Sequence, residues 1–340
     1  MTGVFHRPIP LVGPPWPEGA LPLAGGALFF STVAEHRPGH PTRLVPALDL
    51  PHAARVRLTA PRAPLLGLSL DRPRIMGVLN VTPDSFSDGG RFLAHADAVA
   101  RARALIAAGA DILDIGGEST RPGAHEVPVE QEIARVVPVI EALREDGIAA
   151  PISIDTRKAE VARAAITAGA DLLNDVSALE YDPGSLELAA GTGAAVCLMH
   201  AQGDPRTMQE APRYADVLAE VHAYLAGRVE ACVAAGIPRS RILVDPGIGF
   251  GKTAEHNLAL IDGLAAFHDL GCAVLLGVSR KRFIDVIGTA PNPDDRLPGS
   301  LAAALQGLRR GAQVLRVHDV AETRQAVALW TAIEEGGARR

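Results

Sequence analysis

The stretch Ile75-Met-Gly-Val-Leu-Asn-Val-Thr-Pro-Asp-Ser-Phe-Ser-Asp-Gly-Gly90 decides how the rest of the chain is interpreted. Its first half is a short apolar run, typical of a strand that is buried on both faces in a parallel sheet. Its second half cannot continue the strand, because Pro83 has no N–H and the following Asp, Ser and Gly residues favour turns. This loop carries Phe86 and two carboxylates, Asp84 and Asp88, and we expect it to be a mobile lid over a site.

From Arg74 onward, a β-rich run, a polar turn and an Ala/Leu/Arg-rich helical stretch follow one another repeatedly. The runs that predict strands are 75–82, 111–116, 151–156, 172–177, 195–200, 242–247, 273–279 and 314–319. The stretches that predict helices include 94–108, 129–145, 158–168, 214–235, 254–270, 300–310 and 321–335. Gly-Ala pairs that begin at Gly109, Gly169 and Gly311 end several helices, because glycine adopts the left-handed conformation of a helix C-cap.

Eight such units over about 265 residues predict a (β/α)8 TIM barrel at residues 74–340, since this α/β fold has a typical size of ~250 residues. A doubly wound open sheet is the rival architecture, but it would leave edge strands and seldom needs eight regular repeats. Residues 1–73 are rich in proline, and only 27–33 and 55–59 resemble short strands. We expect residues 1–73 to form an N-terminal accessory extension with no chemistry of its own.

The composition excludes several classes of function. A net charge of −6 and only 4% aromatic residues argue against binding to nucleic acid or to a membrane surface. Apolar runs are too short to cross a bilayer, and we expect no secretory signal in the first residues, because they lack a basic segment followed by an apolar one. Three widely spaced cysteines, Cys197, Cys232 and Cys272, lie in apolar contexts and predict reduced core thiols in a cytoplasmic protein.

Polar side chains recur where the predicted strands end. In a barrel of this kind those ends converge on one mouth, so we expect the side chains to line a polar pocket there. They are Asn80, Asp114, Glu118, Asp155, Asn174, Asp175, His200, Asp245, Lys281, Arg316 and His318, with Met199 among them. Of these, Asp114 and Glu118 could act directly or only support other groups, and Asp175 could simply cap a turn.

The residue types indicate a ligand. Asp155 and Asp245 could each accept two parallel N–H bonds, Asn174 offers a donor and an acceptor, and Lys281 adds donors. Such a set suits a flat, nitrogen-rich heterocycle whose edge alternates donors and acceptors.

A second group of residues suits a diphosphate. Arg316 and His318 are two apart on one strand, so they share a face, which we place opposite the heterocycle. Asn80 is a reasonable single protein ligand for Mg²⁺, which usually keeps waters and binds substrate phosphates as well. The expected chemistry is departure of pyrophosphate from a heterocycle.

Two rival interpretations have weaker support. The segment 247–253, Gly-Ile-Gly-Phe-Gly-Lys-Thr, looks like a phosphate-binding loop, but its glycine spacing is one residue shorter than the Walker motif requires. His200 and His318 could instead be metal ligands of a barrel hydrolase, but neither an H-x-H pair on the first strand nor an obvious third histidine accompanies them.

The motifs together closely resemble those of the dihydropteroate synthase family. They are Asn80–Gly90, Gly116–Gly123 (Gly-Gly-Glu-Ser-Thr-Arg-Pro-Gly), Ile154–Thr156, Asn174–Val176, Leu198–His200, Asp245–Gly247, Ser279–Lys281 and Arg316–His318. The match covers about residues 74–330, in family order. It implies a transferase of folate biosynthesis that condenses 6-hydroxymethyl-7,8-dihydropterin diphosphate with 4-aminobenzoate, giving 7,8-dihydropteroate and pyrophosphate.

The resemblance also implies roles for individual residues. Asn80 would be the Mg²⁺ ligand, and catalysis would involve Asp84, Asp88, Asp155 and Lys281. The substrate-binding residues would be Phe86, Thr120, Arg121, Pro122, Asp155, Asn174, Met199, Asp245, Phe250, Lys281, Arg316 and His318. The implied mechanism is dissociative, with loops that shield a pterin cation from water until the amine attacks, and relatives are homodimers.

Two other functions remain as alternatives on the same fold. A pterin-binding domain of a corrinoid methyltransferase would lack the diphosphate pair and the aminobenzoate loops. A catalytically dead scaffold protein would lack site residues, and none is missing here. Arg282 could pair with the aminobenzoate carboxylate or face solvent.

Overall fold

The computed structural model describes residues 3–37, 39–81, 90–118, 126–203, 208 and 210–334. Within these ranges, eight parallel strands close into a barrel in the order β10-β11-β12-β13-β6-β7-β8-β9. Their bounds are β6 Arg74–Asn80, β7 Ile112–Gly116, β8 Ile152–Asp155, β9 Leu172–Asp175, β10 Ala195–Met199, β11 Ile242–Asp245, β12 Ala273–Leu276 and β13 Val314–Val317. Pairing of β13 with β6 closes the sheet, so the predicted (β/α)8 barrel is confirmed and the open sheet is excluded.

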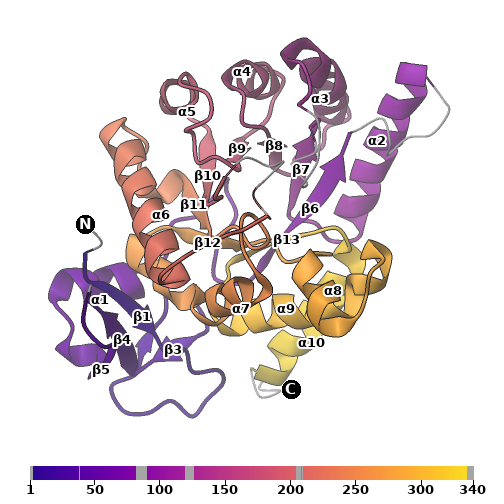
Figure 1. The fold of residues 1–340 in the computed structure, drawn as a ribbon. Coiled ribbons are helices and arrows are strands. Elements are labelled where there is room, and N and C mark those ends of the chain that lie inside the picture. The colour runs from indigo at the N-terminus through magenta and orange to yellow at the C-terminus, as the bar shows by residue number, and fades with distance from the viewer. Residues whose placement is uncertain are drawn as a thin grey trace.

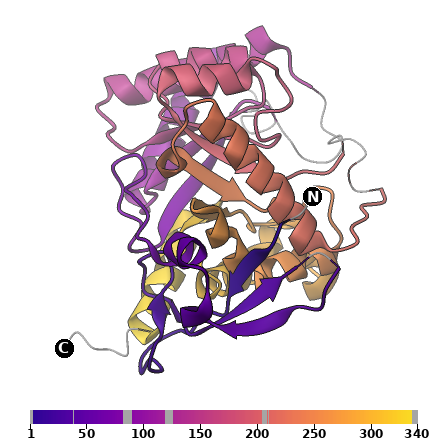
Figure 2. The same cartoon turned by 90° about the vertical axis from the view of Figure 1, so that its left-hand side faces the viewer.

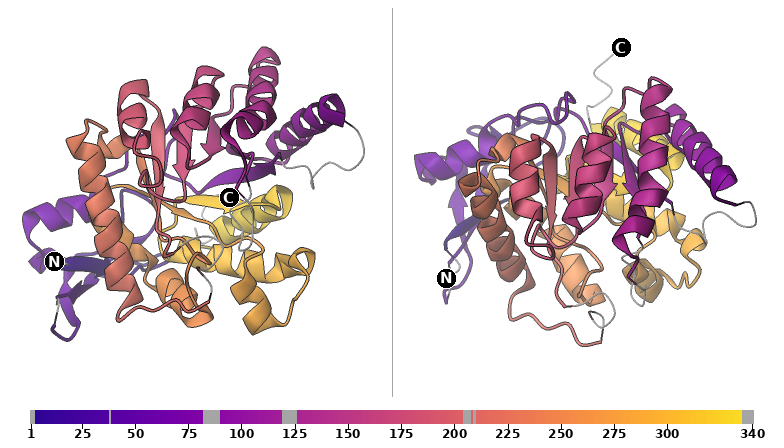
Figure 3. Two further views of the ribbon diagram at one scale, coloured as in Figure 1. Left: turned by 45° about the horizontal axis from the view of Figure 1, so that its top comes forward. Right: turned by 90° about the horizontal axis from the view of Figure 1, so that it is seen from above.

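Helices surround the strands (Figures 1 and 3). The α-helices of the barrel are α2 Gly90–Ala107, α3 Val129–Glu145, α4 Ala159–Thr167, α5 Ser185–Thr192, α6 Val217–Ala234, α7 Ala254–Asp262, α8 Arg282–Gly288, α9 Leu297–Arg309 and α10 Val320–Glu334. Short 3-10 helices are η3 Arg239–Arg241, η4 Leu264–Leu270 and η5 Pro293–Arg296. The three predicted glycine caps adopt φ values of +101° at Gly109, +114° at Gly169 and +99° at Gly311, which confirms why those helices end there.

The helix prediction was wrong in one place and left two helices out. The predicted helix 254–270 is two elements, because Gly263 separates α7 from η4. A Cβ at Gly263 would lie 2.7 Å from the Leu218 side chain, so α6 packs against the backbone at this point. The helices α5 and α8 were not predicted, since segments of eight and seven residues are too short for a clear helical period.

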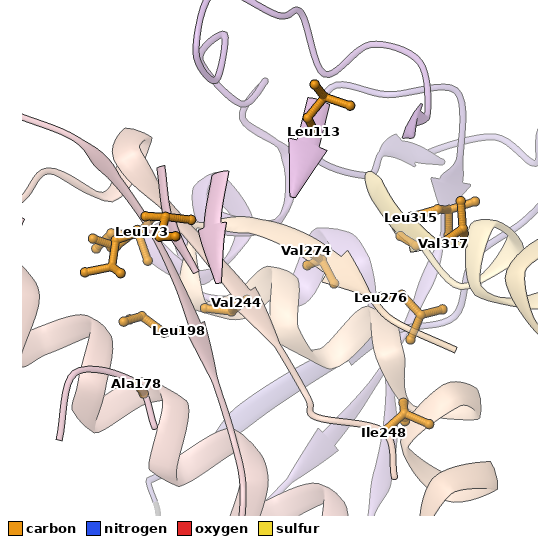
Figure 4. Close-up of a cluster of buried hydrophobic side chains, with 14 of the residues drawn as sticks. Leu113, Leu173, Ala178, Leu198, Val244, Ile248, Val274, Leu276, Leu315 and Val317 are labelled. Atoms are coloured by element: carbon orange, nitrogen blue, oxygen red, sulfur yellow. The ribbon is translucent and has the colours of Figure 1, made fainter. Parts of the chain in front are cut away.

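Two apolar clusters form the core of the barrel. One fills the inside of the barrel and consists of Leu65, Leu70, Met76, Ile112, Leu172, Ala195, Cys197, Leu243, Ala273, Leu275 and Val314. The other lies between the strands and the surrounding helices, and Figure 4 shows part of it, including Leu113, Leu173 and Val244. Adjacent strand residues such as Ile112 and Leu113 belong to different clusters, as expected for strands that are buried on both faces.

The N-terminal extension forms two small antiparallel sheets and a helix. One sheet has the order β1-β4-β5 and the other pairs β2 with β3. The elements are β1 Phe5–Pro8, β2 Leu21–Pro22, β3 Phe29–Phe30, β4 Thr32–His36, β5 Arg43–Pro46, η1 Ala47–Asp49 and α1 His52–Thr59. The strand predicted at 55–59 is therefore wrong, because α1 occupies it and buries Ala54 and Leu58, four residues apart on one helical face.

The extension packs against η4 through β1 and α1. Figures 1 and 2 show it, in indigo, beside the barrel. The His6 backbone N–H donates to Asp269 Oδ2 at 3.1 Å, and Arg57 Nη2 donates to Asp269 Oδ1 at 2.9 Å. Arg62 Nη2 donates to the His268 carbonyl at 3.0 Å. Because Asp269 is only 6% exposed, these polar contacts lie in the interior of the contact surface.

Two further findings bear on the class of protein. The thiols of Cys197, Cys232 and Cys272 are free and buried, as predicted. None of the helices within the described residues has the length and apolar character needed to cross a membrane.

Candidate active site

Strand periodicity places a polar layer above the apolar layer inside the barrel. Side chains two positions apart on a strand point to the same side. Leu172 and Leu243 belong to the interior cluster, so Asn174 and Asp245 also point inward. The same relation links Ile112 to Asp114 and Val314 to Arg316. Each polar residue lies two positions C-terminal to an apolar residue of the interior cluster, so the polar layer is displaced toward the carboxyl ends of the strands, at one end of the barrel.

Arg316 joins several of these strands. Its Nε donates to Asp114 Oδ2 at 2.6 Å, and its Nη2 donates to Asp155 Oδ2 at 2.6 Å. Asn174 Nδ2 donates to Asp114 Oδ1 at 3.3 Å. The sequence predicted Arg316 opposite the residues that would bind the heterocycle, whereas in the structure Arg316 pairs directly with one of them, Asp155, and with Asp114. Closure of the barrel brings β13 within reach of β7 and β8.

The pKa of the Asp155 carboxyl is raised above its ordinary value. Burial raises the pKa of its carboxyl to about 7, while the Arg316 guanidinium opposes the increase and Asp114 adds to it. Its Oδ1 atom is buried and has no hydrogen-bond partner among the described residues. This carboxyl therefore has an unused acceptor and is poised to exchange a proton near neutral pH.

Asp245 lies deep at the end of β11 and is 6% exposed. Its Oδ1 accepts a hydrogen bond from the Gly247 N–H at 2.7 Å. Burial raises the pKa of Asp245, and the nearby charges of Lys281, Arg316 and Lys252 oppose that increase. The three cations thus favour a carboxylate that can accept hydrogen bonds.

The turn after β11 places an aromatic wall beside this carboxylate. Gly247 has φ +70°, and the Phe250 N–H donates to its carbonyl at 3.1 Å. The Phe250 ring lies under the Lys281 ammonium, with Nζ 4.1 Å from the ring centroid, a favourable cation–π geometry. Met199, 5% exposed, is the register partner of Asp245 on the neighbouring strand β10.

The remaining described residues of the predicted site lie at the same strand ends. His318 follows β13, and its Nδ1 is 3.0 Å from Ser279 Oγ. Asn80 ends β6, opposite Gly116 of β7, and is half-buried. Arg282 is exposed at the start of α8.

Six predicted residues belong to segments outside the described part of the chain, so the structure does not place them. They are Asp84, Phe86 and Asp88 of the first loop and Thr120, Arg121 and Pro122 of the second.

Comparison with known proteins decides the family. The model of the family described as "Pterin binding enzyme" matches residues 76–318. The chain is 51% identical over 260 residues to the dihydropteroate synthase of Escherichia coli K12, covering 76% of this chain and 91% of that protein. The chain belongs to the dihydropteroate synthase family. It is therefore a transferase of folate biosynthesis, as the sequence predicted.

Solved dihydropteroate synthase structures support the same conclusion. One from Xanthomonas albilineans with 4-aminobenzoic acid has a TM-score of 0.74 and 51% identity, covering 78% of this chain and 95% of that one. Another from the same organism, in complex with 7,8-dihydropteroate, has a TM-score of 0.72 and 48% identity at the same coverage. The family model begins at residue 76, so the N-terminal extension lies outside the matched region.

The structure shows how Asp114 and Asp175, whose roles the sequence left open, support their neighbours. Asp114 is fully buried and serves as the common partner of Arg316 and Asn174. Asp175 caps a turn, since its carboxylate accepts from the backbone N–H groups of Ser177 and Leu179. The sequence analysis considered Asp175 as a turn cap and Asp114 as a supporting carboxylate without deciding either role, because the partners of both side chains depend on the tertiary structure.

A buried ion-pair cluster next to the site was also missed. Lys158 Nζ donates to Glu118 Oε2 at 2.5 Å, to Glu132 Oε2 at 2.7 Å and to the Val127 carbonyl at 2.6 Å. The Val127 N–H donates to Glu118 Oε2 at 2.8 Å. The position of Lys158 shortly after β8 could have indicated that its side chain lies near the site. Its partners, up to 40 residues away along the chain, could not be deduced.

Among the described residues, no group of three or more His, Cys, Asp and Glu side chains is arranged to hold a metal ion. His200, considered above as a metal ligand, instead contacts Lys252 Nζ through its Nδ1 at 3.0 Å. Burial lowers the pKa of His200 to about 3, and the Lys252 charge adds to this. Its imidazole is therefore neutral and already engaged within the protein.

Proposed function

We propose that this chain condenses 6-hydroxymethyl-7,8-dihydropterin diphosphate with 4-aminobenzoate to give 7,8-dihydropteroate and pyrophosphate. The observation that carries the proposal is the convergence of Asp155, Asn174, Asp245 and Arg316 on one end of the barrel, from four different strands. Similar proteins bind the expected molecules, since solved relatives contain 4-aminobenzoic acid or 7,8-dihydropteroate.

The dihydropterin would lie among the carboxylates. In this proposal Asp245 and Asp155 accept hydrogen bonds from its N–H groups, and Asn174 and Lys281 donate to its ring nitrogens and carbonyl. Met199 and Phe250 supply apolar walls for the flat ring. The unused acceptor of Asp155 and the cations around Asp245 support these roles, because both carboxyls would bind best when ionised.

The diphosphate would lie toward Arg316 and His318. A planar guanidinium suits phosphate oxygens, and a histidine adds one more donor. In the structure Arg316 forms ion pairs with both Asp114 and Asp155, so bound diphosphate would share this cation with two carboxylates. The lid and loop residues Asp84, Phe86, Asp88, Thr120, Arg121 and Pro122 would bind the aminobenzoate and exclude water.

Bond changes follow from the products. The bond between the pterin methylene carbon and the diphosphate oxygen breaks, and its electron pair leaves with pyrophosphate. The resulting cation is stabilised by resonance with the pterin ring. The aminobenzoate nitrogen then forms the new carbon–nitrogen bond and loses a proton. Asp155, with a pKa near 7, is placed to hold charge beside the ring.

Asn80 would hold Mg²⁺. Its amide oxygen is a hard donor at the same end of the barrel as Arg316, which fits an ion that takes few protein ligands and leans on substrate phosphate. When bound, Mg²⁺ would stabilise the negative charge that develops on the departing pyrophosphate.

We also propose that the protein is a cytoplasmic homodimer. Three reduced, buried thiols support a reducing compartment. Leu329 and Ile333 on α10 are 64% and 65% exposed, and this apolar surface supports association through the last helices. Light scattering at micromolar concentration would test the dimer directly, and a mass equal to one chain would contradict it.

A pyrophosphate-release assay tests the activity. Release should require both substrates and Mg²⁺, and Asp245→Asn should abolish it, because one acceptor becomes a donor that faces N–H groups. The pterin affinity should fall by about 2–4 kcal/mol, the cost of leaving buried polar groups unpaired. Asp262→Asn is a matched control, since that carboxylate is 57% exposed and pairs with surface arginines. Unchanged pterin affinity in Asp245→Asn by calorimetry would remove Asp245 from the site.

A further inference from the structure

Lysine is rare in this chain, and its few lysines gather at one place. Only three of the 33 basic Lys and Arg residues are lysines: Lys158, Lys252 and Lys281. Each follows a barrel strand, so all three lie at the carboxyl ends of the strands. Lys158 belongs to the ion-pair cluster with Glu118 and Glu132, and Lys281 lies over Phe250. Lys252 has no role in the chemistry described above.

The Lys252 side chain is turned into the protein. It is 3% exposed, and its Nζ contacts three acceptors: the Phe250 carbonyl at 2.9 Å, the His200 carbonyl at 3.2 Å and His200 Nδ1 at 3.0 Å. An ammonium group has three N–H donors and no acceptor, so three acceptors match it fully. With His200 in the tautomer whose Nδ1 carries no proton, the ammonium form donates to all three atoms. The geometry therefore accommodates the ammonium form.

These bonds link the ends of two neighbouring strands. His200 directly follows β10, and Phe250 lies in the turn after β11. The turn is pressed closely against β10, because a Cβ at Gly247 would lie 1.8 Å from the His200 carbonyl oxygen. Tyr214 adds a further bond, since its hydroxyl donates to the Gly251 carbonyl at 2.9 Å. Lys252 thus fixes the backbone of the residue whose ring lies beneath Lys281.

Charge connects Lys252 to the site as well. Among the groups that face it, Asp245 raises the pKa of Lys252, whereas burial, the largest effect, and Lys281 lower it, to about 7. In return Lys252 lowers the pKa of Asp245, against burial. His200, the other titratable group in contact, is neutral because burial lowers its pKa to about 3. Lys252 is therefore a cation whose charge both holds the turn and favours an ionised Asp245.

We propose that Lys252 is a positioning residue for the pterin: its ammonium group fixes Phe250 beneath Lys281 and keeps Asp245 ionised, without touching the ligand. This inference rests on the proposed function, since Phe250, Lys281 and Asp245 are there assigned to the pterin. It adds to the proposed function a residue that acts through Phe250, Lys281 and Asp245. It also predicts that pterin affinity depends on pH.

The first test compares steady-state kinetics of Lys252→Met and Lys252→Gln with wild type. We expect KM for the dihydropterin diphosphate to rise about tenfold in Lys252→Met, the change given by one lost hydrogen bond to a charged group. KM for 4-aminobenzoate should not change. Arg62→Met is the matched control: it also removes a cation that donates to backbone carbonyls, but Arg62 joins the extension to η4, so KM for the pterin substrate should stay unchanged.

The second test uses pH. The ratio of wild-type affinity to Lys252→Gln affinity for 6-hydroxymethyl-7,8-dihydropterin, measured by calorimetry, should fall as pH rises through about 7, because only wild type has the Lys252 proton to lose. The pH dependence that remains in Lys252→Gln belongs to Asp155, which titrates in the same range, and to the ligand itself. A direct measurement on the wild-type protein does not depend on the folding of a variant. In an NMR titration of protein labelled with ¹³C at lysine Cε, the three lysines give separate signals. The Lys252 signal should titrate near pH 7 in the free protein, and at a higher pH when the pterin is bound.

Several outcomes would overturn the inference. They are an unchanged KM for the pterin substrate in folded Lys252 variants, an equal rise of KM for both substrates, or a Lys252 signal whose titration the pterin does not move. If wild type binds the pterin and the variants bind it equally well at every pH, this inference fails and the proposed function stands. If wild type binds no pterin, both fail.

Discussion

Replacement of Arg316 by Met should destabilise the folded protein, because Asp114 and Asp155 would lose the cation with which they pair. Two hydrogen bonds of 2.6 Å join its guanidinium to Asp114, which is fully buried, and to Asp155. Removal of one partner of a buried ion pair typically costs 3–5 kcal/mol, because the remaining charge is left without compensation. We therefore expect the variant to lose about 3–5 kcal/mol of unfolding free energy at pH 8.

The sign of the pH dependence follows from Asp155. Its pKa in the folded protein is already raised to about 7, and loss of the Arg316 charge raises it further. A carboxyl with a raised folded pKa contributes stability that is present below its ordinary pKa and is lost as pH rises through the folded value. The difference between variant and wild type should thus be smaller at pH 5 than at pH 8.

Urea unfolding followed by circular dichroism at the two pH values measures both quantities. Arg310→Met is the matched control, because Arg310 pairs with Asp262 at the same 2.6 Å distance, but on the surface, with that carboxylate 57% exposed. Exposed pairs contribute about 0–1 kcal/mol. An Arg316→Met cost as small as that of the control, or a cost independent of pH, would refute this account of the site's electrostatics.

Three further predictions concern the turn, the extension and the metal. Gly247→Ala should cost about 3 kcal/mol in urea unfolding, because its Cβ would meet a backbone carbonyl at 1.8 Å; Gly236→Ala, at φ +93° with no atom within 4 Å, should cost about 1 kcal/mol. Asp269→Asn should lose about 2 kcal/mol of unfolding free energy at pH 7 and less at pH 3. Burial raises the pKa of Asp269, but its contacts with His6 and Arg57 outweigh burial and lower the pKa overall, so the stability that the carboxylate contributes disappears as pH falls. Equal losses at both pH values would contradict this prediction. Asn80→Ala should raise the Mg²⁺ concentration for half-maximal velocity about tenfold, and an unchanged Mg²⁺ profile would remove Asn80 as the ligand.

Much of the barrel could be predicted from the sequence because its signals are local. Each apolar run of four to seven residues is buried on both faces, and each is followed by turn residues. The helix ends at Gly109, Gly169 and Gly311 were equally readable, since a positive φ favours glycine whatever the tertiary environment. Where the signal was short or ambiguous, as in α1, α5 and α8, the prediction was wrong or absent.

The candidate site could be predicted as a set of residues but not as a network. Motifs at the strand ends predicted that Asp155, Asn174, Asp245, Lys281 and Arg316 share one end of the barrel, because a barrel brings those ends together. The pairing of Arg316 with Asp114, 202 residues away along the chain, depends on where β13 meets β7. The same holds for the contact of Lys252 with His200, 52 residues apart.

The sequence by itself determined the repeat of strands and helices, the family and the chemical types gathered at one end of the barrel. Only the tertiary structure decided which carboxylate pairs with which cation, and hence which pKa values are raised or lowered. The physical reason is one of range. Periodicity and turn formation depend on neighbours within a few residues, whereas burial and charge pairing depend on groups that closure of the barrel brings together from distant strands.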